Sequence, residues 1–128
     1  MERTWLCCQL GAREHYAVPR ALQRNGLLRE LLTDLWVRPG TLTKWQNKLA
    51  SRFHPELLHA CVTSANVAAL ALELKSQAAG LNGWELIGKR NAWFQETVVN
   101  QLARRAPELD EQPLKQLTND HLQVLSLP

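Results

Sequence analysis

The chain has 128 residues, 45% apolar and 21% charged, and its 15 basic and 12 acidic residues leave a net charge of +3. This length predicts one domain with a core, and the composition excludes a disordered chain, which would carry fewer apolar residues and more net charge. The basic residues are dispersed, whereas nucleic-acid-binding domains usually gather them on one face, so we expect no nucleic-acid partner.

Cysteine usage and the lack of long apolar runs indicate the compartment. Cys7 and Cys8 are neighbours in a predicted strand and therefore point to opposite faces, while Cys61 is remote in sequence. Three such cysteines do not make a disulfide framework, which favours a reducing compartment. We find neither a secretory signal nor a stretch approaching the roughly 20 apolar residues that span a bilayer. We therefore expect a soluble, cytoplasmic protein.

The first forty residues predict a strand–helix–strand unit. An apolar run ends at Gly11, a helical pattern follows and ends at Asn25-Gly26, and a second apolar run ends before Pro39-Gly40. The predicted strand, helix and strand are residues 5–10, 14–25 and 31–37. This is the order of a βαβ unit, whose parallel strands need cover on both faces.

Pro19 leaves two alternatives for the helix of this unit. A proline inside a helix costs roughly 3 kcal/mol through a lost hydrogen bond and a clash. Either the helix kinks at Pro19, or its regular part begins near Val18 with Pro19 in the first turn. The second alternative makes residues 11–17 a loop.

The remainder of the chain is predicted to be mainly helical. Thr41 can cap a helix that runs to about Phe53, and Ser64 or Asn66 can cap another that stops at Gly80. Further helices are predicted at residues 56–61 and 84–105, an acidic linker follows Pro107, and residues 122–127 could begin a third strand or be a frayed end. We expect an α/β fold, a partial Rossmann-like parallel sheet of two or three strands covered by helices, in residues 1–107, with residues 108–128 as a tail.

The loop after the first strand is the main candidate site. In open α/β sheets ligands bind outside the carboxyl ends of the strands, where a glycine lets a phosphate approach the backbone. Gly11 and Ala12 would form this loop, Arg13 adds a forked donor, and His15 adds a titratable group. The alternative is a plain strand-to-helix turn in which Gly11 serves the backbone geometry alone.

Two further candidates carry weaker signals. Asp34 ends the second predicted strand, where it is either a cleft residue or a solvated strand end. Trp45, flanked by Lys44 and Lys48, lies on an amphipathic helix that either faces a membrane surface or packs on its own domain.

Metal and cofactor signals are weak. His54, His59 and Cys61 lack the spacing of a zinc site, and the positions after Gly11 do not continue as a GxGxxG dinucleotide motif. We therefore expect no metal and no cofactor.

A resemblance to a known family comes from residues 6–37, LCCQLGAREHYAVPRALQRNGLLRELLTDLWV. This stretch resembles the opening of bacterial nucleotide-sugar-dependent glycosyltransferases of the GT-B fold, family 4-like (group 1). The segment RFHPEL from Arg52, and the five residues Arg90, Asn91, Trp93, Phe94 and Gln95, are similar to one bacterial branch. The resemblance covers roughly residues 5 to 105.

The resemblance implies an N-terminal, acceptor-side lobe of a two-lobed transferase. By that resemblance Gly11 and Ala12 would lie near the donor diphosphate, with Arg13 or His15 at the cleft edge. Such lobes usually have about six or seven parallel strands, and the second lobe, which grips the nucleotide sugar, is not found here.

We therefore expect a truncated lobe that is inactive alone and that acts, when joined to a C-terminal donor lobe, on a sugar or lipid-linked acceptor. The resemblance further implies a cytoplasmic protein, peripheral at the inner membrane face. The competing hypothesis is a non-catalytic α/β or helical binding module that either pairs with a separate chain or lies on a membrane surface through the Trp45 helix.

Overall fold

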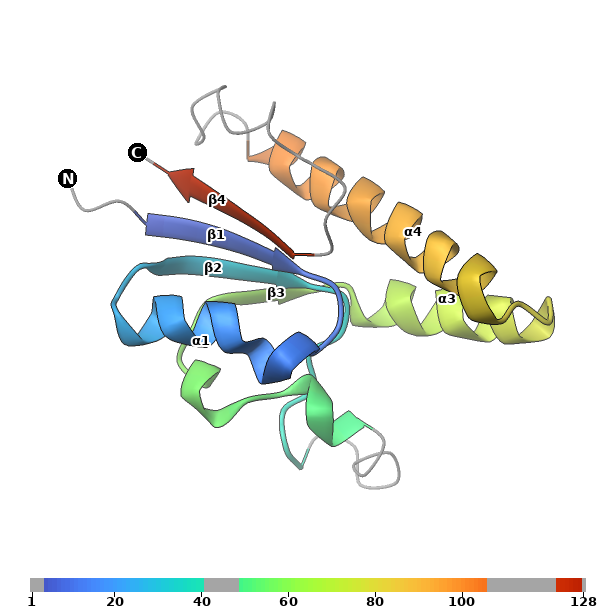
Figure 1. The fold of residues 1–128 in the computed structure, drawn as a ribbon, viewed down its shortest axis with the longest axis horizontal. Helices are drawn as coiled ribbons and strands as arrows, with labels where there is room; N and C mark the ends of the chain where they lie inside the picture. Colours follow the sequence, from blue (N-terminus) through green and yellow to red (C-terminus); the bar gives the residue numbers. More distant parts are fainter. Residues whose placement is uncertain (1–3, 41–48, 106–121, 128) are drawn as a thin grey trace.

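The computed structural model describes residues 4–40, 49–105 and 122–127, and within them it shows an α/β fold built on a four-stranded sheet (Figure 1). The strand order is β3-β2-β1-β4. The strands are β1 (Thr4–Gln9), β2 (Leu28–Thr33), β3 (Val62–Ser64) and β4 (Leu122–Leu127). The first three are parallel and β4 is antiparallel to β1. The predicted α/β class, with a partial parallel sheet covered by helices, is confirmed.

The βαβ unit forms as predicted, with shifted boundaries. A 3-10 turn, η1 (Arg13–Tyr16), precedes helix α1 (Ala17–Arg24), so Pro19 lies in the first turn, where its missing N–H would have had no helical acceptor. The second predicted strand, at residues 31–37, begins earlier and ends at Thr33. It ends there because Thr33 pairs with the last residues of both neighbouring strands, Gln9 and Ser64.

The connection from β2 to β3 differs from the prediction. Residues 56–61 were expected to form a short helix, but only the 3-10 turn η3 (Pro55–Leu57) forms, followed by β3. Earlier in the same connection, the 3-10 turn η2 (Ala50–Arg52) follows Leu49. The β-branched pair Val62-Thr63 was the sequence signal for the missed strand.

Helices α3 (Asn66–Ala78) and α4 (Gly83–Arg104) lie close to their predicted positions. The expected cap of α3 is wrong, because within the described ranges no side chain caps this helix. The amide of Asn66 instead binds the backbone of Trp36, accepting from its N–H and donating to its carbonyl at 2.9 Å each. This pair fixes the start of α3 to the segment that leaves β2.

The sheet has a core on each face. Cys8 and Leu32 face α4, and Cys7 and Leu31 face α1, so the predicted opposite orientation of the two cysteines is confirmed. Helix α4 contributes Phe94, Val98 and Leu102 to the core that contains Cys8 and Leu32. All three cysteines are free, and burial raises the pKa of the Cys7 thiol to about 12.

Two contacts join distant parts of the chain to the sheet. Glu30 on β2 accepts hydrogen bonds from Thr63 Oγ1 at 2.5 Å and from Arg105, just beyond the end of α4. Residues 122–127 pair in continuous register with β1 and therefore belong to the same sheet. None of the helices within the described ranges is long and apolar enough to cross a membrane.

Candidate functional site

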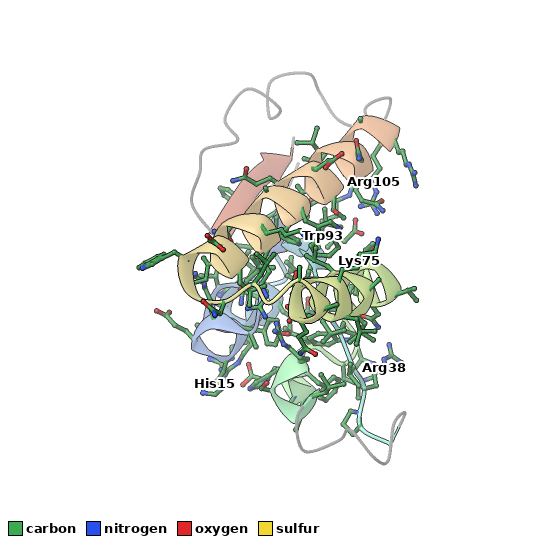
Figure 2. All side chains as sticks on the ribbon, turned by 90° about the vertical axis from the view of Figure 1, so that its right-hand side faces the viewer. His15, Arg38, Lys75, Trp93 and Arg105 are labelled. Atoms are coloured by element: carbon green, nitrogen blue, oxygen red, sulfur yellow. The ribbon has the colours of Figure 1, made fainter. Side chains whose placement is uncertain are left out.

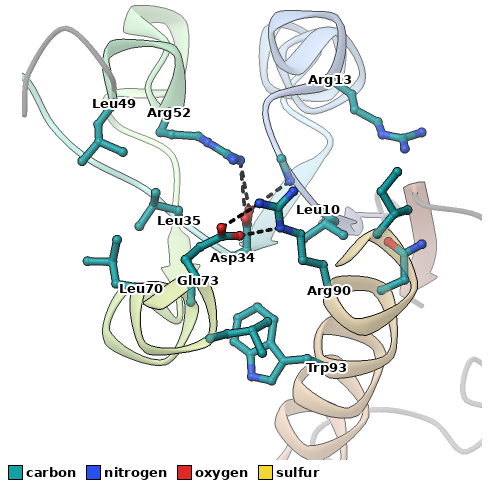
Figure 3. Close-up of a pocket in the computed structure, with 15 residues that line it drawn as sticks. Leu10, Arg13, Asp34, Leu35, Leu49, Arg52, Leu70, Glu73, Arg90 and Trp93 are labelled. Atoms are coloured by element: carbon teal, nitrogen blue, oxygen red, sulfur yellow. Dashed lines mark hydrogen bonds and ion pairs between the residues drawn. The ribbon is translucent and has the colours of Figure 1, made fainter. Parts of the chain in front are cut away.

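A crevice of about 380 Å³ lies at the carboxyl ends of the parallel strands. Its walls come from the segments that follow β1 and β2, from η2, and from α3 and α4 (Figure 3). This is the edge at which open α/β sheets bind ligands. Its volume lies at the lower end of the range for small-molecule sites.

The loop that follows β1 is fixed by two side chains. The backbone N–H of Gly11 donates to Asp34 Oδ1 at 2.9 Å. The amide nitrogen of Gln9, whose side chain is fully buried, donates to the carbonyls of Gly11 at 3.0 Å and Arg13 at 3.2 Å. Gly11 has a φ of +76°, a conformation that costs a residue with a Cβ roughly 1–2 kcal/mol. The loop is therefore held in one shape before any ligand arrives.

A left-handed turn continues this loop. Glu14, His15 and Tyr16 have φ values of 47°, 51° and 60°, and none of them is a glycine. Each such residue costs on the order of 1–2 kcal/mol, so the surroundings must enforce the turn. Arg20 donates to the carbonyl of His15 at 3.4 Å, and the Tyr16 side chain is completely buried.

An aromatic row anchors this turn to η2. The Tyr16 and Trp36 rings meet edge to face with centroids 5.4 Å apart, and the Trp36 and Phe53 rings lie 5.2 Å apart. Phe53 directly follows Arg52, so the row holds the backbone of Arg52 beside the crevice. Burial raises the pKa of the Tyr16 phenol from 10 to about 12.

Asp34 is the acceptor at the centre of the site. Besides Gly11, it accepts from Thr33 Oγ1 at 3.2 Å and from Arg52 Nη1, which lies 3.4 Å from both carboxylate oxygens. Its side chain is largely buried. Because its oxygens already accept three groups, Asp34 ties the two strand ends together and is poorly placed as a general base.

A second ion pair joins α3 and α4, the two helices that line the crevice. Arg90 on α4 donates through Nε and Nη2 to the two oxygens of Glu73 on α3, the Nη2 contact being 2.7 Å. These hydrogen bonds hold the pKa of Arg90 above its usual value. Trp93, one turn further along α4, also lines the crevice. The pair fixes α3 against α4 and leaves little of either charge for a ligand.

Arg13 is the crevice arginine that forms no ion pair with a carboxylate of the described residues. The crevice lining holds three arginines, Arg13, Arg52 and Arg90, and two carboxylates, Asp34 and Glu73. Arg52 and Arg90 form ion pairs with the two carboxylates, and within the described ranges Arg13 has no such partner. Its exposed guanidinium, on a backbone that Gln9 holds, suits an anionic ligand.

The structure brings some of the predicted residues together and separates others. Gly11, Arg13 and Asp34 line the crevice. Ala12, which is partly buried, instead packs against the core on the α1 face. His15 is exposed and outside the crevice lining, and Figure 2 shows it apart from the crevice residue Trp93. The predicted membrane-facing residues Lys44, Trp45 and Lys48 lie outside the described residues.

Sequence reasoning missed several residues of the site. Gln9 gave no signal, because an amide at a strand end fits many roles. Arg52, Arg90, Asn91 and Trp93 line the crevice and belong to the two segments on which the family resemblance also rests, yet no role was predicted for them. Their relation to Gly11 depends on contacts across more than 40 residues of sequence.

Among the described residues, no three histidine, cysteine or acidic side chains lie close enough to hold a metal ion.

Comparisons with protein-family models, with curated proteins and with solved structures gave no match.

Proposed function

We propose that this chain is the acceptor-side lobe of a nucleotide-sugar-dependent glycosyltransferase of the GT-B type, and that it acts with a C-terminal donor lobe. The observation that carries the proposal is the loop from Gly11 to Arg13. It lies at the carboxyl end of β1, is fixed by Gln9 and Asp34, and presents a guanidinium without a described partner. The sequence resemblance supplies the reaction class.

The chemistry available in this lobe is binding and orientation. Arg13 can place two parallel donors on a phosphate oxygen pair, and the glycine lets the ligand approach the backbone. Both crevice carboxylates are ion-paired, so no general base is ready within the described part of the crevice. We therefore expect the isolated chain to bind a diphosphate weakly and to transfer no sugar.

The experiment supplies the donor lobe as a separate chain, taken from a family 4-like enzyme, and measures nucleotide release from UDP-, GDP- and ADP-sugars in the presence of sugar and lipid-linked acceptors. Release should exceed the sum of the two separate lobes and should be lost with Arg13→Gln. The matched control is Arg29→Gln, an exposed arginine on β2 outside the crevice lining. If the two lobes co-elute as a complex but release no nucleotide from any donor, the proposal is wrong.

A binding module without catalysis is the second candidate, and one observation favours it. Val67 and Leu74 on α3 and Trp84 on α4 are 84%, 67% and 86% exposed. Exposed apolar side chains mark an interaction surface where they form a contiguous patch. A module of this kind would keep its partner when Arg13 is changed to Gln and lose it when Leu74 is changed to Asn.

A further inference from the structure

Helix α3 has its large apolar side chains on its exposed side. Val67, Leu70 and Leu74 are 84%, 41% and 67% exposed, whereas the residues that α3 buries are the small Ala69 and Ser76. A helix at the surface of a globular protein normally turns its large apolar side chains toward the core. The apolar side of α3 therefore faces outward from the domain to which the helix belongs.

These exposed side chains form a continuous stripe. Leu70, Ala71 and Leu74 follow Val67 by three, four and seven residues, and this spacing places all four on one face of the helix. Ala71 is exposed as well. Figure 3 shows Leu70 on a different side of α3 from Glu73, which forms the ion pair with α4. The stripe is therefore a contiguous apolar patch, separate from the side of α3 that contacts α4, and such a patch marks an interaction surface.

The direction of α3 determines how a second helix can lie along this stripe. Figure 1 shows that α3 begins where β3 ends and extends beyond the carboxyl ends of the strands, instead of returning over the sheet. If α3 pairs with α3 of a second copy in antiparallel orientation, the two sheets lie at opposite ends of the helix pair. A parallel pair would bring both sheets to the same end, although helix axes in contact are only about 8–10 Å apart. The fold therefore favours the antiparallel pair.

The stripe is complementary to itself in this orientation. With a two-fold axis midway between Leu70 and Ala71, Leu70 lies against Ala71 of the second copy. The same axis sets Val67 against Leu74 of the second copy. A large side chain thus meets a small one at the centre, where alanine lets the two helices approach closely, and apolar side chains meet at both ends. A two-fold dimer requires a surface patch that matches itself in this way.

The charges on α3 are compatible with the antiparallel pair. Glu73 is already paired with Arg90, and the other charged residue of the helix is the exposed Lys75. The two-fold axis places Lys75 level with Asn66 of the second copy. The two Lys75 residues are then about 14 Å apart along the helix axis, which exceeds the screening length of roughly 8 Å at physiological salt. The pair therefore brings no like charges together.

We propose that the stripe Val67, Leu70, Ala71 and Leu74 binds the same stripe of a second copy of this chain in an antiparallel, two-fold dimer. The stripe covers about two helical turns, so the contact is smaller than the roughly 800 Å² per partner of a standard interface. We therefore expect a reversible dimer with a dissociation constant on the order of 10–100 µM. The inference does not depend on the transferase proposal, and Val67 and Leu74 lie outside the crevice lining.

The experiment is sedimentation-equilibrium ultracentrifugation of the full chain between about 5 and 500 µM, a range across which the wild type should pass from monomer to dimer. Leu74→Asn should raise the dissociation constant at least tenfold, because it sets an amide against Val67 of the second copy. The matched control is Trp84→Gln, since Trp84 is 86% exposed but lies on α4. This control should leave the dissociation constant unchanged. Circular dichroism establishes that each variant is folded.

Mixing pairs of variants tests the orientation. Val67→Glu and Leu74→Lys should each form no dimer alone, because each new charge lies against an apolar side chain of an identical copy. Mixed in equal amounts, they should form a heterodimer in which the two new charges face each other at one end and the native contact remains at the other. Val67→Glu mixed with Val67→Lys is the control, and it should stay monomeric, because position 67 does not face itself in the antiparallel pair.

Three results would overturn the proposal. The first is a wild-type chain that stays monomeric at about 500 µM, which would leave the stripe to a different partner. The second is a dimer that Leu74→Asn and Trp84→Gln weaken equally. The third is a heterodimer from the two Val67 variants but none from Val67→Glu with Leu74→Lys. Pyrophosphate binding at Arg13 is measured separately, so failure of the dimer is distinguishable from failure of the transferase proposal.

Discussion

The backbone N–H of Gly11 donates to Asp34 Oδ1 at 2.9 Å, and this one hydrogen bond joins the residues that follow β1 to those that follow β2. The same carboxylate receives Arg52 from η2. Three separate parts of the chain therefore meet at Asp34, and the shape of the crevice depends on that meeting.

Replacing Gly11 by alanine should destabilise the fold and displace Arg52. Alanine at position 11 would have to keep a φ of +76°, and its Cβ would lie 3.3 Å from Arg52 Nη1. Gly26→Ala is the matched control, because Gly26 has a φ of +67° and no atom of the described part of the chain lies within 4 Å of its Cβ position. We expect Gly26→Ala to lower the free energy of unfolding by about 1–2 kcal/mol and Gly11→Ala by about 1 kcal/mol more, measured by urea denaturation. Equal losses would show that the contact with Arg52 does not matter.

Two substitutions of Asp34 should differ in their effect on stability. Asp34→Asn keeps an oxygen for the Gly11 N–H and loses mainly the long contact to Arg52, so we expect a cost below about 1 kcal/mol. Asp34→Ala leaves that N–H without an acceptor and should cost about 1–3 kcal/mol. Urea denaturation of both variants provides the measurement. If the asparagine variant is as unstable as the alanine variant, the ion pair rather than the hydrogen bond holds the strand ends together.

Replacing Ser76 by alanine should stabilise the protein. The Ser76 hydroxyl is buried on α3 and has no hydrogen-bond partner among the residues that the structure describes. Removing an unsatisfied buried hydroxyl at nearly constant volume should raise the free energy of unfolding by about 1 kcal/mol. Gln77→Ala, at the exposed neighbouring position of the same helix, measures the gain from helix propensity alone. A gain no larger than that of Gln77→Ala would mean that the hydroxyl is satisfied in solution.

Acid should weaken a surface cluster around Glu56. Hydrogen bonds from Arg24 and Arg20 lower the pKa of this carboxyl from 4.5 to about 2. Since the folded pKa is depressed, its stabilising contribution is present above about pH 4.5 and is lost as the pH falls toward 2. Urea denaturation between these pH values should show the difference between wild type and Glu56→Gln shrinking toward zero. A difference that stays constant across this range would contradict the assignment.

The order β1-α1-β2 could be predicted because the first apolar run ends at Gly11, the helical pattern ends at Asn25-Gly26, and the second apolar run ends before Pro39-Gly40. Other features of the fold could not be predicted. Strand β3 has only three residues, too few for a periodic pattern, and it forms because β2 offers it an open edge. The left-handed turn at Glu14–Tyr16 contains no glycine or asparagine, so only the burial of Tyr16 and the contacts around it select that conformation.

The candidate site could be predicted only where it is local. Gly11 and Arg13 follow β1 directly, and strand polarity brings Asp34 beside them. Ala12 and His15 were predicted from their place in the loop and from the family resemblance, and the structure places both outside the crevice lining. Arg52 and Arg90 reach the crevice through packing of η2 and α4, which no spacing in the sequence encodes.

The most direct test of the central claim is an NMR titration of the ¹⁵N-labelled chain with pyrophosphate. The account predicts that the largest amide shifts occur at residues 11–13 and that Arg13→Gln weakens binding at least fivefold, while Arg29→Gln does not. Shifts that gather instead around Arg20 and Arg24, or no shift at residues 11–13 at saturating pyrophosphate, would contradict the claim that this loop receives donor phosphates.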